Sequence, residues 1–168
     1  MSAWRLSNRA DTEVARIADR HYNRQTIGSP QFAPPGRCLV LKTAPCDAFW
    51  ITSFPFARYV RHAWAGEWVC SAFRNEGSAL SSDLIREAVA ITRWRFVVPE
   101  RFGLITFIDA GKVRRKRDPG RCFRRAGFRD AGYTRGGLVA LLLELADMPE
   151  PLAPHGAQLD AFSVEATA

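Results

Sequence analysis

The densest group of chemically active side chains lies at residues 112–129, where nine residues are basic and one, Asp118, is acidic. Lys and Arg at this density neutralise nucleic-acid phosphates and release their counterions, so the segment predicts contact with DNA. One bound cofactor does not need nine cations. The alternative interpretation is a solvated protein face that is rich in arginine. The DNA contacts expected in this segment are Lys112, Arg114, Arg115, Lys116, Arg117 and Arg121.

A second segment, residues 54–68, interleaves aromatic rings with basic side chains. Aromatic faces and guanidinium planes can stack an extruded base and hold its flanking phosphates. A base that is paired in a duplex must leave the stack before its amine can be modified. Tyr59 and Arg61 are the two residues that we expect to be exposed for this role. The alternative is that part of these rings are core residues on neighbouring strands.

Three further residues could carry acid–base chemistry. Asp109 ends an apolar segment that we expect to be a central strand, and the carboxyl ends of strands border the binding crevice in open α/β sheets. A carboxylate there could orient or deprotonate an attacking amine. His21 and Tyr22 are expected on the inward side of a first helix, where a histidine can also be a plain core residue. Together the three could form a general acid–base group, or bind iron through one nitrogen and two oxygen ligands.

The elements that must position these residues follow from the apolar pattern. Asp11 or Thr12 can cap the first helix, whose apolar positions recur at steps of three and four up to Tyr22. The expected strands are residues 38–43, 49–54, 68–73, 103–109 and 137–145; the expected helices are residues 82–96 and a short one after Asp118-Pro119 that closes at Gly127. This order predicts an α/β domain with a mixed sheet over residues 1–147. Residues 148–168, which contain three prolines at 149, 151 and 154, are expected to be a loosely structured tail.

Composition narrows the class of protein. The chain has 168 residues, which suits one domain, and a formal net charge of +7, which favours an anionic partner. Its longest apolar run, residues 138–145, is too short to cross a bilayer, and residues 1–13 lack a secretory signal. The four cysteines have no metal-site spacing. We therefore expect reduced thiols, no membrane association and a cytoplasmic location in a bacterium or a phage-infected host.

Residues 121–145 resemble the closing section of GCN5-related N-acetyltransferases, the GNAT superfamily, where a short helix ending in aromatic-x-x-x-Gly-Phe leads into a long strand. Phe123, Gly127 and Phe128 carry this pattern. Upstream, the strand, loop and helix at residues 68–96 resemble the acyl-CoA section of that family. Helix N-termini bind phosphate through free N–H groups and the helix dipole. The resemblance implies a mixed, centrally splayed sheet flanked by helices, and acetyl-CoA or a related acyl donor held by Arg74, Gly77, Ser78, Ser81 and Ser82.

Within that superfamily, the whole chain most resembles the Mom-type DNA-modification proteins of bacteriophages. The shared features are His21-Tyr22, the loop from Arg74 to Ser82, and the basic segment before the last helix. This resemblance implies a group-transfer enzyme that modifies the exocyclic amine of adenine in DNA and protects phage genomes from restriction. Phe123 follows Cys122 where many acetyltransferases have a tyrosine, which favours an atypical reaction. The alternatives are an acetyl-CoA-dependent N-acetyltransferase of a small amine and a non-catalytic DNA-binding protein with the same fold.

Overall fold

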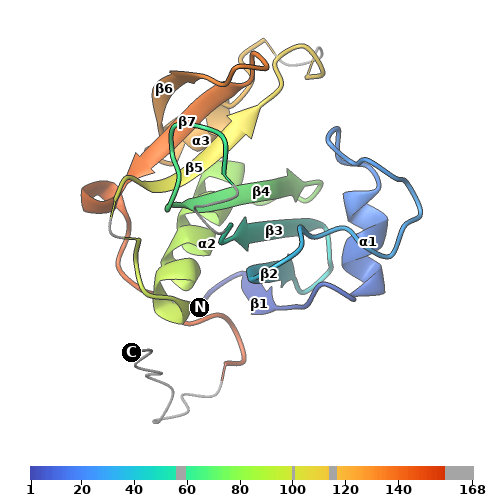
Figure 1. Ribbon diagram of the computed structural model, residues 1–168. Helices are drawn as coiled ribbons and strands as arrows, with labels where there is room; N and C mark the ends of the chain where they lie inside the picture. The colour runs from blue at the N-terminus through green and yellow to red at the C-terminus, as the bar shows by residue number, and fades with distance from the viewer. Residues whose placement is uncertain (56–59, 100, 114–116, 158–168) are drawn as a thin grey trace.

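The computed structural model describes residues 1–55, 60–99, 101–113 and 117–157, and in these ranges seven strands form one open sheet (Figure 1). The strands are β1 (Trp4–Leu6), β2 (Cys38–Thr43), β3 (Ala48–Ser53), β4 (Trp68–Asn75), β5 (Gly103–Ile108), β6 (Arg129–Tyr133) and β7 (Val139–Glu144). The helices are α1 (Thr12–Ala18), α2 (Ser81–Arg95), α3 (Arg121–Arg125) and the 3₁₀ helix η2 (Leu145–Asp147). The spatial order is β1-β2-β3-β4-β5-β7-β6, so the predicted mixed α/β domain is confirmed.

Two helices cover parts of the two faces of the sheet. α2 buries Leu84, Ile85, Ala88 and other apolar residues in the main core, because these positions recur at helical spacing. The shorter α1 packs on the other face, where Val14 and its neighbours meet apolar residues of β2 and β3. Most of the sheet is antiparallel, and helical cover is sparse.

The first helix is shorter than the apolar pattern predicts, which moves two candidate catalytic residues off it. Asp11 caps α1 through Glu13 N and Val14 N, as expected, but the helix ends at Ala18. The Asp19 carboxylate then accepts hydrogen bonds from Arg24 Nε and Gly28 N at 2.9 and 3.1 Å, which turns the chain back. His21 and Tyr22 therefore lie in the connection after α1, and the expectation that they lie on a helix was wrong.

The central pair of strands separates along its length. β4 and β5 are parallel, and their pairing runs from Trp68↔Leu104 to Cys70↔Thr106. β4 continues to Asn75 and β5 to Ile108 without further pairing to each other, and the two strands diverge toward those ends (Figure 1). A register shift between β3 and β4 lies at the same level, where Cys70 and Ala72 face adjacent residues of β3. Such irregularities bend a strand, so β4 turns away from β5 at this point.

Two strands and part of the expected tail differ from the sequence analysis. β6 has no buried residue, so it lacks the alternation of apolar and polar residues that identifies a strand. β1 has only three residues. Beyond residue 147 the chain stays attached to the domain as far as the structure describes it. Met148 is buried in the main core, Leu152 N donates to Ala90 O at 3.1 Å, and His155 N donates to Trp4 O at 2.8 Å.

Candidate functional site

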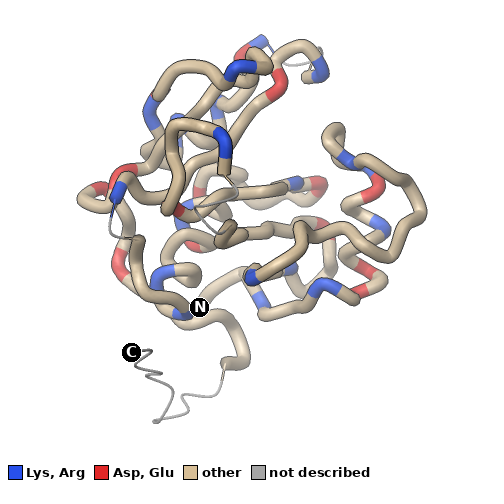
Figure 2. Tube along the Cα trace, viewed as in Figure 1, with Lys and Arg blue, Asp and Glu red and all other residues tan. Residues whose placement is uncertain are grey.

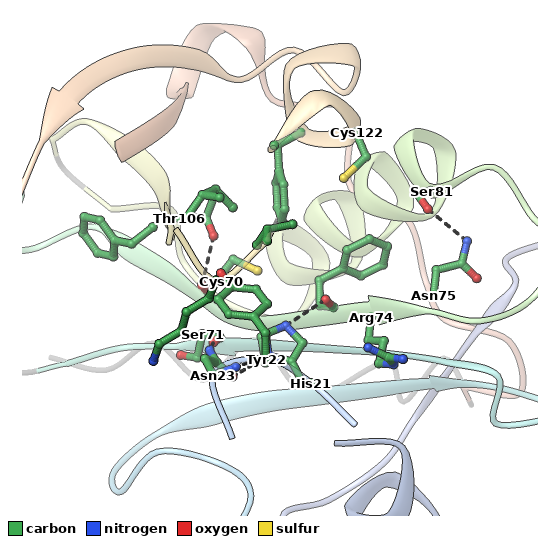
Figure 3. Close-up of a pocket in the computed structure, with 18 residues that line it drawn as sticks. His21, Tyr22, Asn23, Cys70, Ser71, Arg74, Asn75, Ser81, Thr106 and Cys122 are labelled. Atoms are coloured by element: carbon green, nitrogen blue, oxygen red, sulfur yellow. Dashed lines mark hydrogen bonds between the residues drawn. The ribbon is translucent and has the colours of Figure 1, made fainter. Parts of the chain in front are cut away.

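A cavity of about 530 Å³ opens where β4 and β5 separate (Figure 3). Its walls come from β4, β5, α3 and the connection after α1, which are far apart in the sequence. We call it the first cavity. Its lining residues are His21, Tyr22, Asn23, Cys70, Ser71, Ala72, Phe73, Arg74, Asn75, Ser81, Thr106, Phe107, Ile108, Lys112, Val113, Gly120, Cys122 and Phe123.

Side chains from the connection after α1 bind the edge of β4 that β5 has left. His21 Nε2 donates to Phe73 O at 3.1 Å, and Asn23 Nδ2 donates to Ser71 O at 3.1 Å (Figure 3). The other ring nitrogen of His21 is within hydrogen-bonding distance of the Asn23 amide oxygen. Both carbonyls lie beyond Cys70, the last β4 residue that pairs with β5. These bonds fix His21 and its neighbour Tyr22 against the first cavity.

The structure brings Tyr22 to the predicted base Asp109. The rings of Tyr22 and His21 stack with their centroids 4.7 Å apart, which orients the phenol. Burial raises the pKa of Tyr22, and a hydrogen bond with the backbone of Asp109 partly offsets that rise. The tyrosine is therefore a neutral hydroxyl at neutral pH, next to the end of β5.

The carboxylate of Asp109 has a local structural role as well. Its Oδ1 accepts hydrogen bonds from Gly111 N at 3.1 Å and Lys112 N at 3.2 Å, which closes the turn after β5. Lys112 Nζ lies 4.0 Å from its other oxygen. Among the described residues, Ile108 before Asp109 and Lys112 after it line the first cavity, but Asp109 itself does not. The structure thus places His21 and Tyr22 in one cavity and Asp109 beside it.

The same three residues are the predicted ligands of iron. Hydrogen bonds within the protein already occupy the ring nitrogens of His21 and Oδ1 of Asp109. Over residues 1–55, 60–99, 101–113 and 117–157, no group of three or more His, Cys, Asp or Glu side chains could hold a metal ion. That set of residue types does not include tyrosine, so the iron set of His21, Tyr22 and Asp109 stays a prediction, and we derive no step through a metal.

A second cavity, of about 680 Å³, adjoins the first. It brings the predicted cofactor loop to the start of α3, where three arginines face the loop. Its lining residues are Asn75, Gly77, Ser78, Ala79, Leu80, Ser81, Ser82, Arg117, Asp118, Gly120, Arg121, Cys122 and Arg125. The two cavities share Asn75, Ser81, Gly120 and Cys122, so they are parts of one recess.

The loop between β4 and α2 is held open toward this second cavity. Asn75 Oδ1 accepts from Gly77 N at 2.9 Å, and its amide nitrogen donates to Ala79 O and Ser81 Oγ at 2.7 and 3.0 Å. Leu80 precedes the first turn of α2, and no side chain in the described part of the protein caps that turn. The N-terminus of this 15-residue helix therefore presents backbone N–H groups and a positive dipole end to the second cavity.

Arg74 departs from its predicted place in the cofactor loop. It lines the first cavity but not the second, and its guanidinium binds within the protein. Arg74 Nε pairs with Glu76 at 2.6 Å, and Nη1 donates to Arg20 O at 2.7 Å. Glu76 also pairs with Arg20 at 2.7 Å, and these guanidinium groups, Arg20 first, hold the pKa of Glu76 at about 2. Arg74 thus stabilises the loop through bonds within the protein. The arginines that line the second cavity together with the loop are Arg117, Arg121 and Arg125.

The predicted DNA contacts lie in different parts of the structure. Arg117 and Arg121 line the second cavity and Lys112 lines the first, while Arg61 is exposed. Basic residues are spread over both halves of the sheet, with acidic residues among them (Figure 2). Tyr59, Arg114, Arg115 and Lys116 lie outside the described residues.

Several lining residues were not identified from the sequence. Asn23, Phe73 and Thr106 have ordinary residue types, and only the fold brings them to the cavity. Thr106 Oγ1 donates to Cys70 O at 3.3 Å, at the last residue pair before the strands part. Asn75 carried a signal, because an asparagine two residues before a glycine is typical of a side-chain-stabilised turn. That signal could have identified it as the residue that shapes the loop.

The fold is a mixed α/β domain with a recess between diverging parallel strands. Comparison with protein-family models, curated proteins and solved structures finds no significant match. Within the described residues, no helix has the length and apolar character to span a membrane. The family resemblance, the cofactor, the DNA partner and the location stay predictions.

Proposed function

We propose that the chain is a group-transfer enzyme with a GNAT-like fold that modifies the exocyclic amine of adenine in DNA. The observation that carries the proposal is the pair of adjoining cavities. One is built from a helix N-terminus and arginines, which suit phosphates, and the other lies between separated strands, which suits the reacting groups. A donor with a phosphorylated handle and an activated group would use both.

The sheet supports the GNAT-like interpretation of the fold. Its parallel pair, β4 and β5, is joined from Trp68 to Cys70 and then separates, which agrees with the central splay that the resemblance implies. Phe123 is buried in the middle of α3, and Gly127, just after the C-cap Ala126, has a φ of 107°, a conformation that favours glycine. The closing pattern of the resemblance therefore coincides with a real helix end that leads into β6 and β7.

The second cavity fits acetyl-CoA or a related acyl donor. Ser81 and Ser82 open α2, and the guanidinium groups of Arg117 and Arg121 lie across the cavity from them. Backbone N–H groups and forked guanidinium donors are the usual partners of phosphate oxygens. The donor, when bound, supplies an activated acyl group. The chain's part is to hold the phosphates and direct the rest of the donor past Cys122, which lines both cavities.

The first cavity supplies the acceptor side. Tyr22, Phe73, Phe107 and Phe123 give it aromatic walls, against which an extruded base could stack. In the proposed reaction the amine nitrogen replaces the donor's leaving group on the acyl carbon. Asp109 accepts the proton that the amine loses, and that proton then passes to the leaving group. Tyr22, which hydrogen-bonds to the Asp109 backbone, orients the amine toward it. His21 holds Tyr22 by stacking, so we assign it a positioning role.

A second candidate, an N-acetyltransferase of a small amine, is favoured by one observation. Arg117 and Arg121, two of the expected DNA contacts, line the donor cavity, so part of the basic segment is explained without DNA. A third candidate, a non-catalytic DNA-binding protein, explains the net charge of +7 but gives the recess no role. The remaining positive charge, including exposed Arg61 and Lys112 at the first cavity, favours a polyanionic acceptor.

The donor site can be tested by calorimetric titration of coenzyme A. Arg121→Ser should weaken binding about 10-fold or more, because one charge-assisted hydrogen bond to phosphate contributes about 1.5–3 kcal/mol. Arg129→Ser is the matched control, since Arg129 lies on the exposed β6, pairs with Asp147 at 3.4 Å and lines neither cavity. Equal weakening in both variants, or no binding by the wild type at millimolar concentration, would reject the donor site.

A further inference from the structure

Glu67 is a buried carboxylate that the proposed reaction does not use. It precedes Trp68 at the start of β4, and its side chain has 0% of its surface exposed. Among the described residues, neither of its carboxylate oxygens has a hydrogen-bond partner. An ionised carboxylate without partners is costly in a protein interior, so the group either keeps a proton or has a partner that can change.

Two charged or titratable groups of the described chain interact with Glu67. His62 Nδ1 lies 3.8 Å from Oε1, just outside hydrogen-bonding distance, and Arg101 acts on it electrostatically from the segment before β5. Burial raises the pKa of Glu67 to about 7, and the nearby backbone N–H of Glu67 itself, followed by Arg101, opposes this rise. Burial also lowers the pKa of His62. Near neutral pH Glu67 therefore gains or loses its proton beside a neutral His62.

His62 connects this pair to the wall of the first cavity. Its ring lies 5.0 Å from the ring of Phe107, centroid to centroid, and 6.0 Å from that of Trp64. Trp64 and Phe107 are also 6.0 Å apart, so the three rings form one cluster. Phe107 lines the first cavity. A change in the position of the His62 ring would therefore reach the cavity wall through direct ring contacts.

We propose that Glu67 is a proton-dependent positioning residue: the gain or loss of its proton decides whether Nδ1 of His62 accepts from Trp64 or donates to Glu67, and thereby where His62 holds Phe107. The importance of Phe107 for an acceptor rests on the proposed function. The proton exchange and the ring movement do not, since they depend only on contacts within the protein.

The geometry defines two states that differ by one proton. In the first, Glu67 is a neutral acid, and Nδ1 of neutral His62 accepts from Trp64 N at 3.1 Å, as in the structure. In the second, at higher pH, Glu67 has released its proton to solvent and is ionised, and His62, still neutral, carries its ring proton on Nδ1. Nδ1–H then donates to the Glu67 carboxylate and can no longer accept from Trp64 N, so the His62 ring must shift.

NMR titration of the full chain between pH 4 and 9 tests the proposal. The Glu67 carboxyl ¹³C resonance should titrate near pH 7, and the Phe107 ring resonances should shift with the same midpoint. Glu67→Gln keeps the shape of the side chain but cannot titrate, so the Phe107 step should disappear. Glu144→Gln is the control, because Glu144 is an exposed residue of β7, and the step should persist in it.

His62→Phe is the second variant, and it keeps the proposal testable if Glu67→Gln does not fold. It preserves an aromatic contact with Phe107 but removes Nδ1, the atom that would exchange Trp64 for Glu67, so the Phe107 step should again be lost. A Phe107 step that survives in His62→Phe overturns the proposal. So does a Glu67 midpoint near the ordinary glutamate value of about 4.3 in the wild type. Since no donor, DNA or activity enters these measurements, their failure would leave the proposed function untouched.

Discussion

At the residue scale, Asp109 combines a structural hydrogen-bonding role with the proposed role of base. Both backbone N–H groups that it accepts, from Gly111 and Lys112, bind the same oxygen, Oδ1. An asparagine keeps one such oxygen, so Asp109→Asn can preserve the turn while it removes the charge. The two roles can therefore be separated by a single substitution.

Asp109→Asn should leave the melting temperature close to that of the wild type and reduce DNA modification about 10²–10⁴-fold, the usual contribution of general acid–base catalysis. The measurement is the fraction of modified deoxyadenosine at matched protein levels. Asp147→Asn, at an exposed ion pair with Arg129, is the control and should retain activity. Full activity in Asp109→Asn would exclude this carboxylate as the base.

Glu67 should give the stability of the protein a distinctive pH dependence. Its folded-state pKa of about 7 lies above the ordinary value of 4.5, so the folded state binds its proton more tightly than the unfolded state does. This contribution is fully present below pH 4.5 and is lost as the pH rises to about 7. Urea unfolding should show the wild type losing on the order of 3 kcal/mol relative to Glu67→Gln across this range. A constant difference between the two proteins would contradict the raised pKa.

His21 and Tyr22 were predicted to be site residues from their types and apolar spacing, and the glycine–serine loop from the family resemblance. All of them line a cavity, although for His21 and Tyr22 the expected element was wrong. The end of α1 depends on hydrogen bonds of Asp19 to residues five and nine positions later, which apolar periodicity does not encode. The contacts of Asn23 with β4 could not be predicted for a related reason. They need the β4 edge to be free, and that depends on where β5 leaves it.

At the element scale, the loop between β4 and α2 depends on close packing against the β2–β3 turn. A Cβ added at Gly77 would lie 2.2 Å from Oδ2 of Asp47, closer than any real contact. Asp47 is itself held, because its Oδ1 accepts from Thr43 Oγ1 at 2.6 Å and its backbone oxygen accepts from Glu76 N at 2.7 Å. The glycine is required here by space and not by its φ angle.

Gly77→Ala should therefore destabilise the protein by about 1–3 kcal/mol, as overpacking does, and weaken coenzyme A binding by displacing the loop. Thermal unfolding and calorimetry measure the two effects. Gly136→Ala is the matched control, because the nearest atom to its Cβ, Thr134 Oγ1, would lie at an ordinary 3.9 Å. If both variants behave alike, the close approach to Asp47 does not hold the loop in place.

How closely each helix or strand could be predicted from the sequence depends on how much apolar surface it buries. β2, β3, β5, β7 and α2 were predicted nearly to their ends, because each has a run or stripe of buried apolar residues. β6, with an exposed pattern throughout, gave no such signal and is defined by its pairing with β7. The separation of β4 from β5 was expected from the family resemblance alone, since no local pattern marks where two parallel strands part.

At the scale of the whole molecule, a recess with a phosphate-suited part and an aromatic part lies in a protein with a net charge of +7. Positive charge of this size attracts polyanions over distances longer than any single contact. The spread of basic residues over both halves of the sheet fits a long acceptor such as DNA better than a small amine (Figure 2). Under the proposed function, a donor in the second cavity and a DNA acceptor would then contact different parts of the same charge distribution.

The central claim, modification of adenine in DNA, is tested most directly by mass spectrometry of nucleosides from the DNA of cells that express the protein. Our account predicts a new deoxyadenosine derivative of higher mass in cells with the wild type. It also predicts that the derivative is nearly absent with Asp109→Asn at equal expression. Unmodified deoxyadenosine in DNA, together with an acetylated small amine in the cell extract, would contradict the claim in favour of the second candidate. Unmodified DNA without such a product, from cells that contain the folded wild-type protein, would contradict it in favour of a DNA-binding protein without catalysis.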